Sequence, residues 1–173
     1  MANSKHPIGI IGAGTMGAGI AQLAATHGWT VYLSDVDDLT IRKRLDGVQK
    51  RLDRLVDKGL MTVLERKDVL TRIKPARSDE DLKECDLVIE AVVEDLGVKT
   101  MVLGRAVHVL PKDAVIASNT SSLSIAKIGE AIGMPHRTVG MHFFNPAPLM
   151  PLVEVVGTQR SSAEAVRRAA LIA

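Results

Sequence analysis

The chain has 173 residues, 46% of them hydrophobic, which suits one well-packed domain, and we treat residues 1–173 as that domain. Its formal charge of +2 is too small to indicate nucleic acid as a partner, and no apolar run approaches the roughly 20 residues that a membrane span needs. The single cysteine, Cys85, excludes an intramolecular disulfide and gives no reason to expect a metal. The N-terminus, MANSKHP, lacks the hydrophobic core of a signal peptide. Together these two features favour a cytoplasmic protein.

The first 35 residues carry a strand, a glycine turn, a helix and a second strand. Residues 8–11 form a β-branched run, apolar residues at helical spacing continue to Gly28, and a second β-prone run, Trp29 to Ser34, ends on Asp35. The turn between the first strand and the helix reads G-x-G-x-x-G, which in this context is typical of a dinucleotide site rather than of an ordinary glycine turn. The helix directs unpaired N–H groups at the phosphates. The predicted cofactor-binding residues of this turn are Gly12, Gly14, Thr15, Met16 and Gly17.

Asp35 indicates which dinucleotide is bound. An acid at the end of the second strand can accept hydrogen bonds from both hydroxyls of the adenosine ribose, and it would repel the extra phosphate of NADP. Arg42 and Lys43 come too late in the sequence to overturn this preference. The predicted cofactor is therefore NAD.

A helical hairpin follows. Apolar side chains at spacings of three and four predict a long amphipathic helix from about residue 38 to Gly59, and Thr62 with Glu65 makes a capping box for a second helix through about Arg72. A plain dinucleotide fold does not need this insertion, so we expect it to contact something other than the core. Seven cations and three acids lie between Arg42 and Lys58. Solvation of a helix surface is the plainer interpretation of this basic face, and a polyanionic ligand is the alternative.

The rest of the chain alternates strands and helices. We expect a short helix from Ser78 to about Glu84, helices over 96–110 and 125–132 and from about Ser162, and strands over 87–92, 114–118, 138–144 and 152–156. Lys99 and Arg105, on the first of the longer helices, are expected to reach solvent. The pattern predicts an α/β protein: a Rossmann-like doubly wound, mainly parallel sheet with a helical hairpin insertion after the second strand, and with ligands at the carboxyl ends of the strands.

Two later stretches carry residues suited to chemistry. Glu154 lies in an apolar strand, where an ionised carboxylate is costly unless it is paired, and His142 on the neighbouring strand is the natural partner. Glu154 would hold His142 in one tautomer as a general base toward a hydroxyl; a buried structural pair is the alternative. In Asn119-Thr120-Ser121-Ser122, Ser121 is expected to bind ligand while Ser122 or Ser124 caps the next helix. Hydride transfer needs a base but no nucleophile.

Four ordered motifs, IGIIGAGTMGAGIA, LVIEAVVEDLGVK, SNTSSLSI and GMHFFNPAPLMPLVEVV, resemble the L-3-hydroxyacyl-CoA dehydrogenases, including the 3-hydroxybutyryl-CoA type, over essentially the whole chain. The resemblance implies an NAD-dependent enzyme of fatty acid metabolism that interconverts (S)-3-hydroxyacyl-CoA and 3-oxoacyl-CoA. It implies His142 as the catalytic base, Glu154 as its partner, and Ser121 and Asn145 as residues that contact the substrate oxygens. It also implies that the hairpin meets the CoA moiety. The further residues that we assign to NAD are Asp35 at the adenosine ribose, Glu94 and Lys99 near the nicotinamide ribose, and Asn119.

The resemblance further implies a C-terminal all-helical domain that closes over the acyl chain and forms most of a homodimer interface, and nothing in these 173 residues matches it. The last expected helix has no stop signal before Ala173, as if the sequence were cut within or just after it. An isolated, non-catalytic NAD-binding module and a structural protein like the related lens crystallin are the alternatives. Neither would need both His142 and Glu154. A β-hydroxyacid dehydrogenase that acts on free acids is a more distant alternative.

Overall fold

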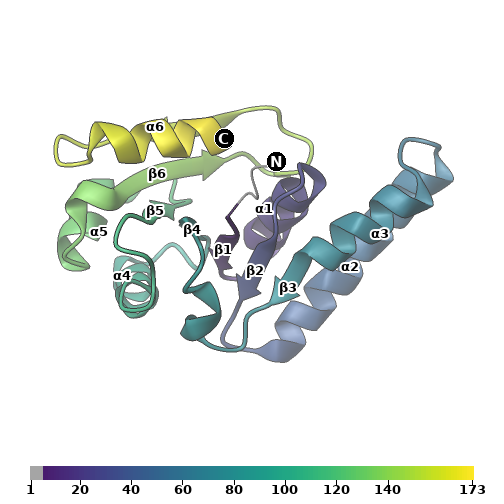
Figure 1. Cartoon of the computed structure of the whole chain (residues 1–173), viewed down its shortest axis with the longest axis horizontal. Coiled ribbons are helices and arrows are strands. Elements are labelled where there is room, and N and C mark those ends of the chain that lie inside the picture. Colours follow the sequence, from purple (N-terminus) through teal and green to yellow (C-terminus); the bar gives the residue numbers. More distant parts are fainter. Residues whose placement is uncertain (1–5) are drawn as a thin grey trace.

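The computed structural model describes residues 6–173; the first five residues, part of the segment in which we expected no targeting signal, lie outside the described residues. A seven-stranded sheet with the order β3-β2-β1-β4-β5-β6-β7 runs through its centre (Figure 1). Neighbouring strands are parallel except for β7, which pairs antiparallel with β6. The predicted doubly wound, mainly parallel sheet is confirmed. The strands are β1 (Ile8–Ile11), β2 (Val31–Ser34), β3 (Ile73–Pro75), β4 (Leu87–Glu90), β5 (Val115–Ser118), β6 (Thr138–Phe143) and β7 (Val153–Val156).

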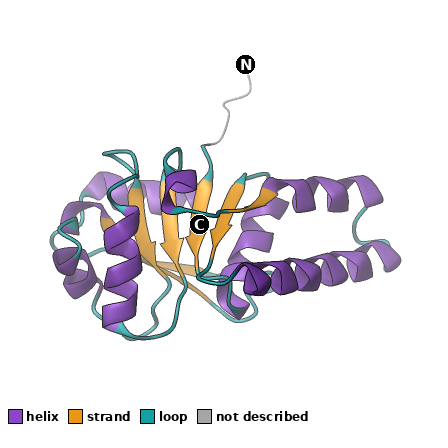
Figure 2. Cartoon of the chain, turned by 90° about the horizontal axis from the view of Figure 1, so that it is seen from below, coloured by secondary structure: helices purple, strands orange, loops and turns teal. Residues whose placement is uncertain are grey.

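Helices cover both faces of the sheet (Figure 2). Strand residues alternate between two apolar clusters, so that Ile8 and Ile10 pack with α1, α2, α3 and α6 whereas Ile11 and Val88 pack with α4 and α5. Burial on both faces is why the strands read as continuous apolar runs. The helices are α1 (Thr15–Thr26), α2 (Asp38–Asp57), α3 (Val63–Arg72), α4 (Leu96–Ala106), α5 (Ile125–Ala131) and α6 (Ala163–Ile172), with short 3-10 helices η1 (Asp79–Leu82) and η2 (Pro135–Arg137).

One strand was not expected, and one helix ends about four residues earlier than predicted; the other predicted elements agree to within two residues at each end. β3 was not expected, because it follows α3 directly and contains a proline; an edge strand tolerates proline, since one side of it forms no ladder. α4 ends at Ala106 instead of near Leu110, and residues 107–110 form turns that bring Leu110 back into the core. Pro111 follows, and the residue before a proline is disfavoured in a helix.

The α2–α3 hairpin projects away from the sheet, as Figure 1 shows, and confirms the predicted insertion. The capping box is formed: Thr62 Oγ1 accepts a hydrogen bond from the Glu65 N–H at 3.1 Å, and Glu65 Oε2 accepts one from the Thr62 N–H at 2.7 Å. The Arg51 Nε–H donates to Gln22 Oε1 at 2.8 Å and so ties α2 to α1. An ion pair between Arg66 and Asp53 joins the two helices of the hairpin.

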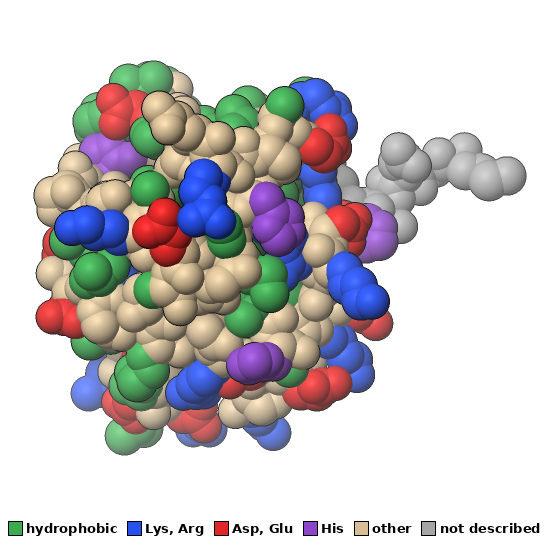
Figure 3. Space-filling model, turned by 90° about the vertical axis from the view of Figure 1, so that its left-hand side faces the viewer, with side chains coloured by type: hydrophobic (Ala, Val, Ile, Leu, Met, Phe, Trp, Pro, Cys, Tyr) green, Lys and Arg blue, Asp and Glu red, His purple; other side chains and the backbone are tan. Residues whose placement is uncertain are grey.

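On the face of the molecule that Figure 3 shows, acidic and basic side chains are interspersed, and no large area carries one sign of charge. Within residues 6–173, no helix is both long enough and apolar enough to cross a membrane.

Candidate active site

The glycine turn between β1 and α1 is shaped by one positive φ, one close approach and one open position. Gly12 has φ of 103°, and a Cβ built on Gly17 would lie 1.8 Å from the Gly12 carbonyl oxygen, so a side chain at Gly17 would force the turn apart. A Cβ on Gly14 would meet nothing within 4 Å. Gly14 is also the N-cap residue of α1, and no side chain caps this helix end. The first-turn N–H groups are therefore available to an anion such as a pyrophosphate.

A cavity of about 590 Å³ lies beside this turn, where the strand order reverses between β1 and β4. Gly12, Gly14 and Asp35 line it on one side, and α4 contributes apolar side chains such as Val98 and Val102. The other polar residues that line it are Ser34, Arg77, Ser78, Asp79 and Arg105. Asp35 Oδ2 accepts a hydrogen bond from the Ala13 N–H at 2.6 Å, which holds the carboxylate against the turn. An open glycine, an acid and an apolar wall at a topological switch point fit the adenosine and pyrophosphate of NAD.

Behind the loop after β4, Glu94 and Lys99, which the sequence assigned to NAD, form a network with Glu90, which the sequence did not single out. Glu90 is 0% exposed and accepts hydrogen bonds from the Val92 N–H at 2.7 Å, Lys99 Nζ at 2.8 Å and Ser118 Oγ at 2.6 Å. Lys99 is 1% exposed and also lies 3.2 Å from Glu94 Oε2. The expectation that Lys99 reaches solvent is wrong, because its charge is balanced inside the protein.

Glu94 connects this network to the loop after β5. Thr120 and Ser122 both donate to Glu94 Oε1 through their hydroxyl groups, the second at 3.0 Å. Partial burial acts to raise the pKa of Glu94, but hydrogen bonds from Thr120, Lys99 and Ser122 outweigh it and lower the pKa to about 2. Glu94 therefore stays ionised at neutral pH.

The loop Asn119 to Ser122 divides its polar groups between structure and solvent. Ser124, one of the two serines expected to cap α5, does so by accepting a hydrogen bond from the Lys127 N–H at 3.3 Å. Asn119 Oδ1 accepts a hydrogen bond from the Phe143 N–H at 2.9 Å, which joins the ends of β5 and β6. Ser121 is exposed, and its hydroxyl has no hydrogen-bond partner within residues 6–173. Ser121 is thus the hydroxyl of this loop that is left for a ligand.

His142 and Glu154 stand directly opposite each other on β6 and β7, with Nδ1 2.8 Å from Oε2. The predicted pairing is confirmed, but the premise of burial is wrong: Glu154 is 52% exposed because β7 is the edge strand, while His142 is 24% exposed. The His142 ring also contacts Phe144, with 4.8 Å between ring centroids. Nε2 has no hydrogen-bond partner in the described part of the chain, so it is left to face a substrate.

Most of the predicted site residues lie at one edge of the sheet, at or just beyond the carboxyl ends of the strands. The glycine turn follows β1, Asp35 follows β2, Glu94 follows β4, residues 119–122 follow β5, and His142 lies near the end of β6. Asn145 is three residues beyond His142, with an exposed side chain and a cis bond to Pro146. Within residues 6–173, no group of three or more His, Cys, Asp or Glu side chains is placed to hold a metal ion.

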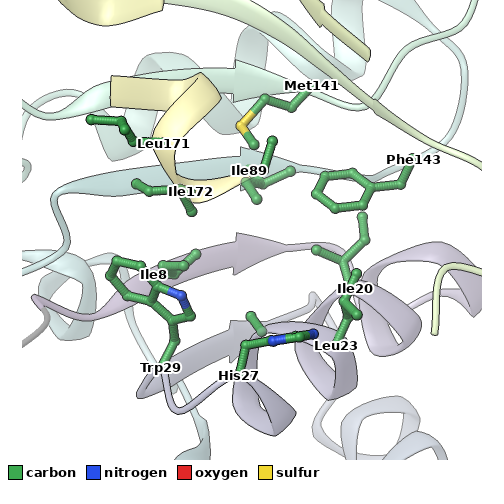
Figure 4. A pocket seen from close by; sticks show the side chains of 12 residues that line it. Ile8, Ile20, Leu23, His27, Trp29, Ile89, Met141, Phe143, Leu171 and Ile172 are labelled. Carbon is green, nitrogen blue, oxygen red and sulfur yellow. The ribbon is translucent and has the colours of Figure 1, made fainter. Parts of the chain in front are cut away.

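A second cavity, of about 350 Å³, lies between α1 and the end of α6 (Figure 4). Its walls are mostly apolar side chains, among them Ile8, Ile89 and Met141, which point from the sheet toward the two helices. Neither the glycine turn nor His142 borders it. The site described above is therefore separate from this cavity.

Comparison with known proteins agrees with this geometry. Residues 7–173 match the family model described as 3-hydroxyacyl-CoA dehydrogenase, NAD binding domain. The chain is 42% identical over 161 residues to a 3-hydroxyadipyl-CoA dehydrogenase of Escherichia coli strain K12, an alignment that covers 93% of this chain and 34% of that protein.

Solved structures give the same result. A 3-hydroxybutyryl-CoA dehydrogenase from Escherichia coli K12 superposes with a TM-score of 0.93 at 40% identity, covering 96% of this chain and 36% of that one. An (S)-3-hydroxybutyryl-CoA dehydrogenase from Ralstonia eutropha gives the same TM-score and identity and covers 96% and 59% of the two chains. The chain thus spans between about a third and three fifths of the length of these relatives.

Proposed function

Because the chain belongs to the 3-hydroxyacyl-CoA dehydrogenase family, of which it matches the NAD-binding domain over residues 7–173, we propose that it is the catalytic, cofactor-binding part of an enzyme that interconverts (S)-3-hydroxyacyl-CoA and 3-oxoacyl-CoA. One observation carries the proposal beyond NAD binding. His142 is paired with Glu154 at the same sheet edge as the glycine turn, with Nε2 left to face a substrate. A module that only binds NAD has no use for this pair.

NAD supplies the hydride acceptor when it is bound. The residues that would hold its adenosine and pyrophosphate are those of the glycine turn and Asp35. Gly12, Gly14 and Asp35 border one cavity, whereas Thr15, Met16 and Gly17 do not line it. Glu94 would accept a hydrogen bond from the nicotinamide ribose, supported by Lys99, and Asn119 would set the position of the loop beneath it.

His142 would act as the general base. Glu154 accepts a hydrogen bond from the Nδ1–H, which leaves the lone pair of Nε2 to take the proton of the substrate's 3-hydroxyl group. The imidazolium that results is stabilised by the carboxylate of Glu154. In the reverse direction, Nε2 returns the proton to the oxygen of the 3-oxo group. The Ser121 hydroxyl and the Asn145 amide would bind the substrate oxygens.

The CoA moiety gives the basic face of the helical hairpin a role. CoA carries several phosphate charges, and the cations of α2 would attract them. In this proposal the hairpin binds CoA while the sheet edge binds NAD and the acyl carbons that react. We also propose that the complete enzyme is a homodimer and works in the cytoplasm, which the family resemblance and the single, buried cysteine support.

The test is reduction of acetoacetyl-CoA, followed by the loss of NADH absorbance, with the wild-type chain and His142→Ala. General base catalysis contributes about 10²- to 10⁴-fold, so the variant should lose at least about 100-fold in turnover while its NADH affinity stays nearly unchanged. Glu154→Gln should lose less, because His142 remains. His108→Ala, at an exposed histidine beyond the end of α4, is the matched control and should behave like wild type.

Turnover by His142→Ala at the wild-type rate would remove His142 from the mechanism. A wild-type chain that binds NADH but gives no turnover would mean that this chain is the cofactor half of an enzyme whose turnover needs the helical domain that the resemblance implies.

A further inference from the structure

We propose that Glu90 is a positioning residue for the nicotinamide half of NAD, acting through Lys99 and Glu94. The inference rests on the proposed function, since it takes Glu94 as a group that contacts the nicotinamide ribose. Glu90, at the end of β4, would not touch the cofactor itself. It would determine whether Glu94, the group that contacts the ribose, is held in place.

The burial of Glu90 is the first step of the argument. A carboxylate that is 0% exposed is strongly destabilising unless donors surround it, and here they come from three separate elements. The Val92 N–H belongs to the loop after β4, Lys99 to α4 and Ser118 to the end of β5. Glu90 therefore fixes the relative positions of three segments behind the loops that line the site.

Lys99 transmits this constraint. An ammonium group has three N–H donors, and those of Lys99 have three protein acceptors: Glu90 Oε1 at 2.8 Å, Glu94 Oε2 at 3.2 Å and the Val92 carbonyl oxygen at 3.4 Å. Two carboxylates thus share one lysine. Glu90 balances the charge of Lys99, and the network as a whole carries one net negative charge, which lies on the more exposed acid, Glu94.

Glu94 is the member of the network that reaches the site, with 41% of its side chain exposed. Its Oε1 accepts from Thr120 and Ser122, and its Oε2 forms an ion pair with Lys99 and has no other partner within residues 6–173. A carboxylate offers about four lone-pair positions, so one position on Oε2 is left for a ribose hydroxyl. The same contacts hold the loop that carries Ser121.

Neutralising Glu90 would change this balance without removing any group that faces the ligand. In Glu90→Gln the charge of Lys99 is balanced by Glu94 alone, so Lys99 draws Glu94 inward and the negative charge at the nicotinamide end is cancelled. The glycine turn and Asp35, which would bind the adenosine half, make no hydrogen bond to Glu90, Lys99 or Glu94, and their cavity meets the network only at Val92. The two halves of the cofactor should therefore respond differently.

The experiment is isothermal titration calorimetry of wild type and Glu90→Gln with NADH and with ADP, which lacks the nicotinamide ribose. We expect the Kd for NADH to rise about tenfold, the effect of losing one hydrogen bond to a charged group, while the Kd for ADP stays within about twofold. Ser118→Ala removes one donor to Glu90 and keeps every charge; it should weaken NADH binding to a smaller degree and spare ADP. Asp86→Asn, which removes a carboxylate paired with Arg168 just before β4, is the matched control and should leave both ligands unchanged.

If Glu90→Gln weakened the binding of NADH and of ADP equally, the role of Glu90 would be merely structural. If both Glu90→Gln and Ser118→Ala bound NADH with wild-type affinity, the network would position nothing. Either result overturns the inference and leaves the proposed function standing. Failure of the wild-type chain to bind NADH would instead overturn the proposed function, and this inference with it.

Discussion

At the scale of single residues, the site depends on carboxylates whose charge is set by the donors around them. Glu94 is the clearest case, because Thr120, Lys99 and Ser122 together hold its pKa at about 2 although partial burial opposes them. Such a shift is also a statement about folding stability, since the unfolded chain has lost these donors.

Glu94→Gln tests this linkage. The pKa is lower in the folded than in the unfolded protein, so ionised Glu94 stabilises the fold above the unfolded value of 4.5, and that contribution is lost as the pH falls toward 2. The free energy of unfolding of wild type should therefore exceed that of Glu94→Gln by a constant amount down to about pH 5, and the difference should shrink between 4.5 and 2. Urea unfolding of both proteins at a series of pH values measures it. A difference that grows on acidification would contradict the assignment.

Glu90 and Glu154 show what could be predicted about the site and what could not. The argument that a carboxylate in an apolar strand needs a partner found the pair of Glu154 with His142, yet Glu154 is half exposed on an edge strand. The same argument applies to Glu90, which follows the apolar residues Leu87-Val88-Ile89. Glu90 is both buried and paired, as the argument requires. Which strand lies at the edge is a property of the whole sheet, so the sequence of one strand could not separate the two cases.

At the scale of elements, short-range chemistry sets the ends of the helical hairpin. Asp37 caps α2 by accepting from the N–H groups of Leu39 and Thr40, and Thr62 caps α3 in a reciprocal pair with Glu65. Gly59, with φ of 66°, ends the first helix in a conformation that glycine adopts without strain. Each signal acts within four residues, which is why the hairpin could be predicted from the sequence.

Thr62→Ala should lower the free energy of unfolding by about 1 kcal/mol, the usual cost of losing an N-cap side chain, and should leave NADH affinity unchanged because the cap is remote from the dinucleotide site. Chemical denaturation and an NADH titration provide the two measurements. Thr71→Ala, at an exposed threonine in the last turn of the same helix, is the control. An equal loss in both variants would mean that the stabilisation does not come from capping.

β3 could not be predicted in this way, because a longer-range contact decides it, and the end of α4 depends on packing of Leu110 as well as on the local effect of Pro111. Ile73 pairs with Val31, which is 42 residues earlier in the chain, and this pairing turns Lys74 and Pro75 into a strand that their own propensities disfavour. The residues after Ala106 keep a helical pattern in sequence, but they turn so that Leu110 can pack against the second apolar cluster.

At the scale of the whole molecule, the unbroken sheet makes the domain one unit. β1 and β4 contribute residues to both apolar clusters, so neither cluster can be lost without exposing the other. The alternation of strands and helices was enough to predict this architecture, because parallel strands connected through helices have few allowed arrangements. The cavity that we propose for NAD lies across the middle of the sheet, where β1, β2 and β4 end, and a ligand bound there would stabilise the unit as a whole.

Thermal unfolding should therefore show one transition, and NADH should shift it without splitting it. At a concentration 100 times its Kd, NADH stabilises the folded state by about 2.7 kcal/mol, which corresponds to a rise in Tm of roughly 5 to 11 °C for a domain of this size. NADPH at the same concentration should give a much smaller shift, because Asp35 would repel its additional phosphate. Equal shifts with both nucleotides would place the ribose of the cofactor away from Asp35, and two separate transitions would mean that the halves of the sheet unfold independently.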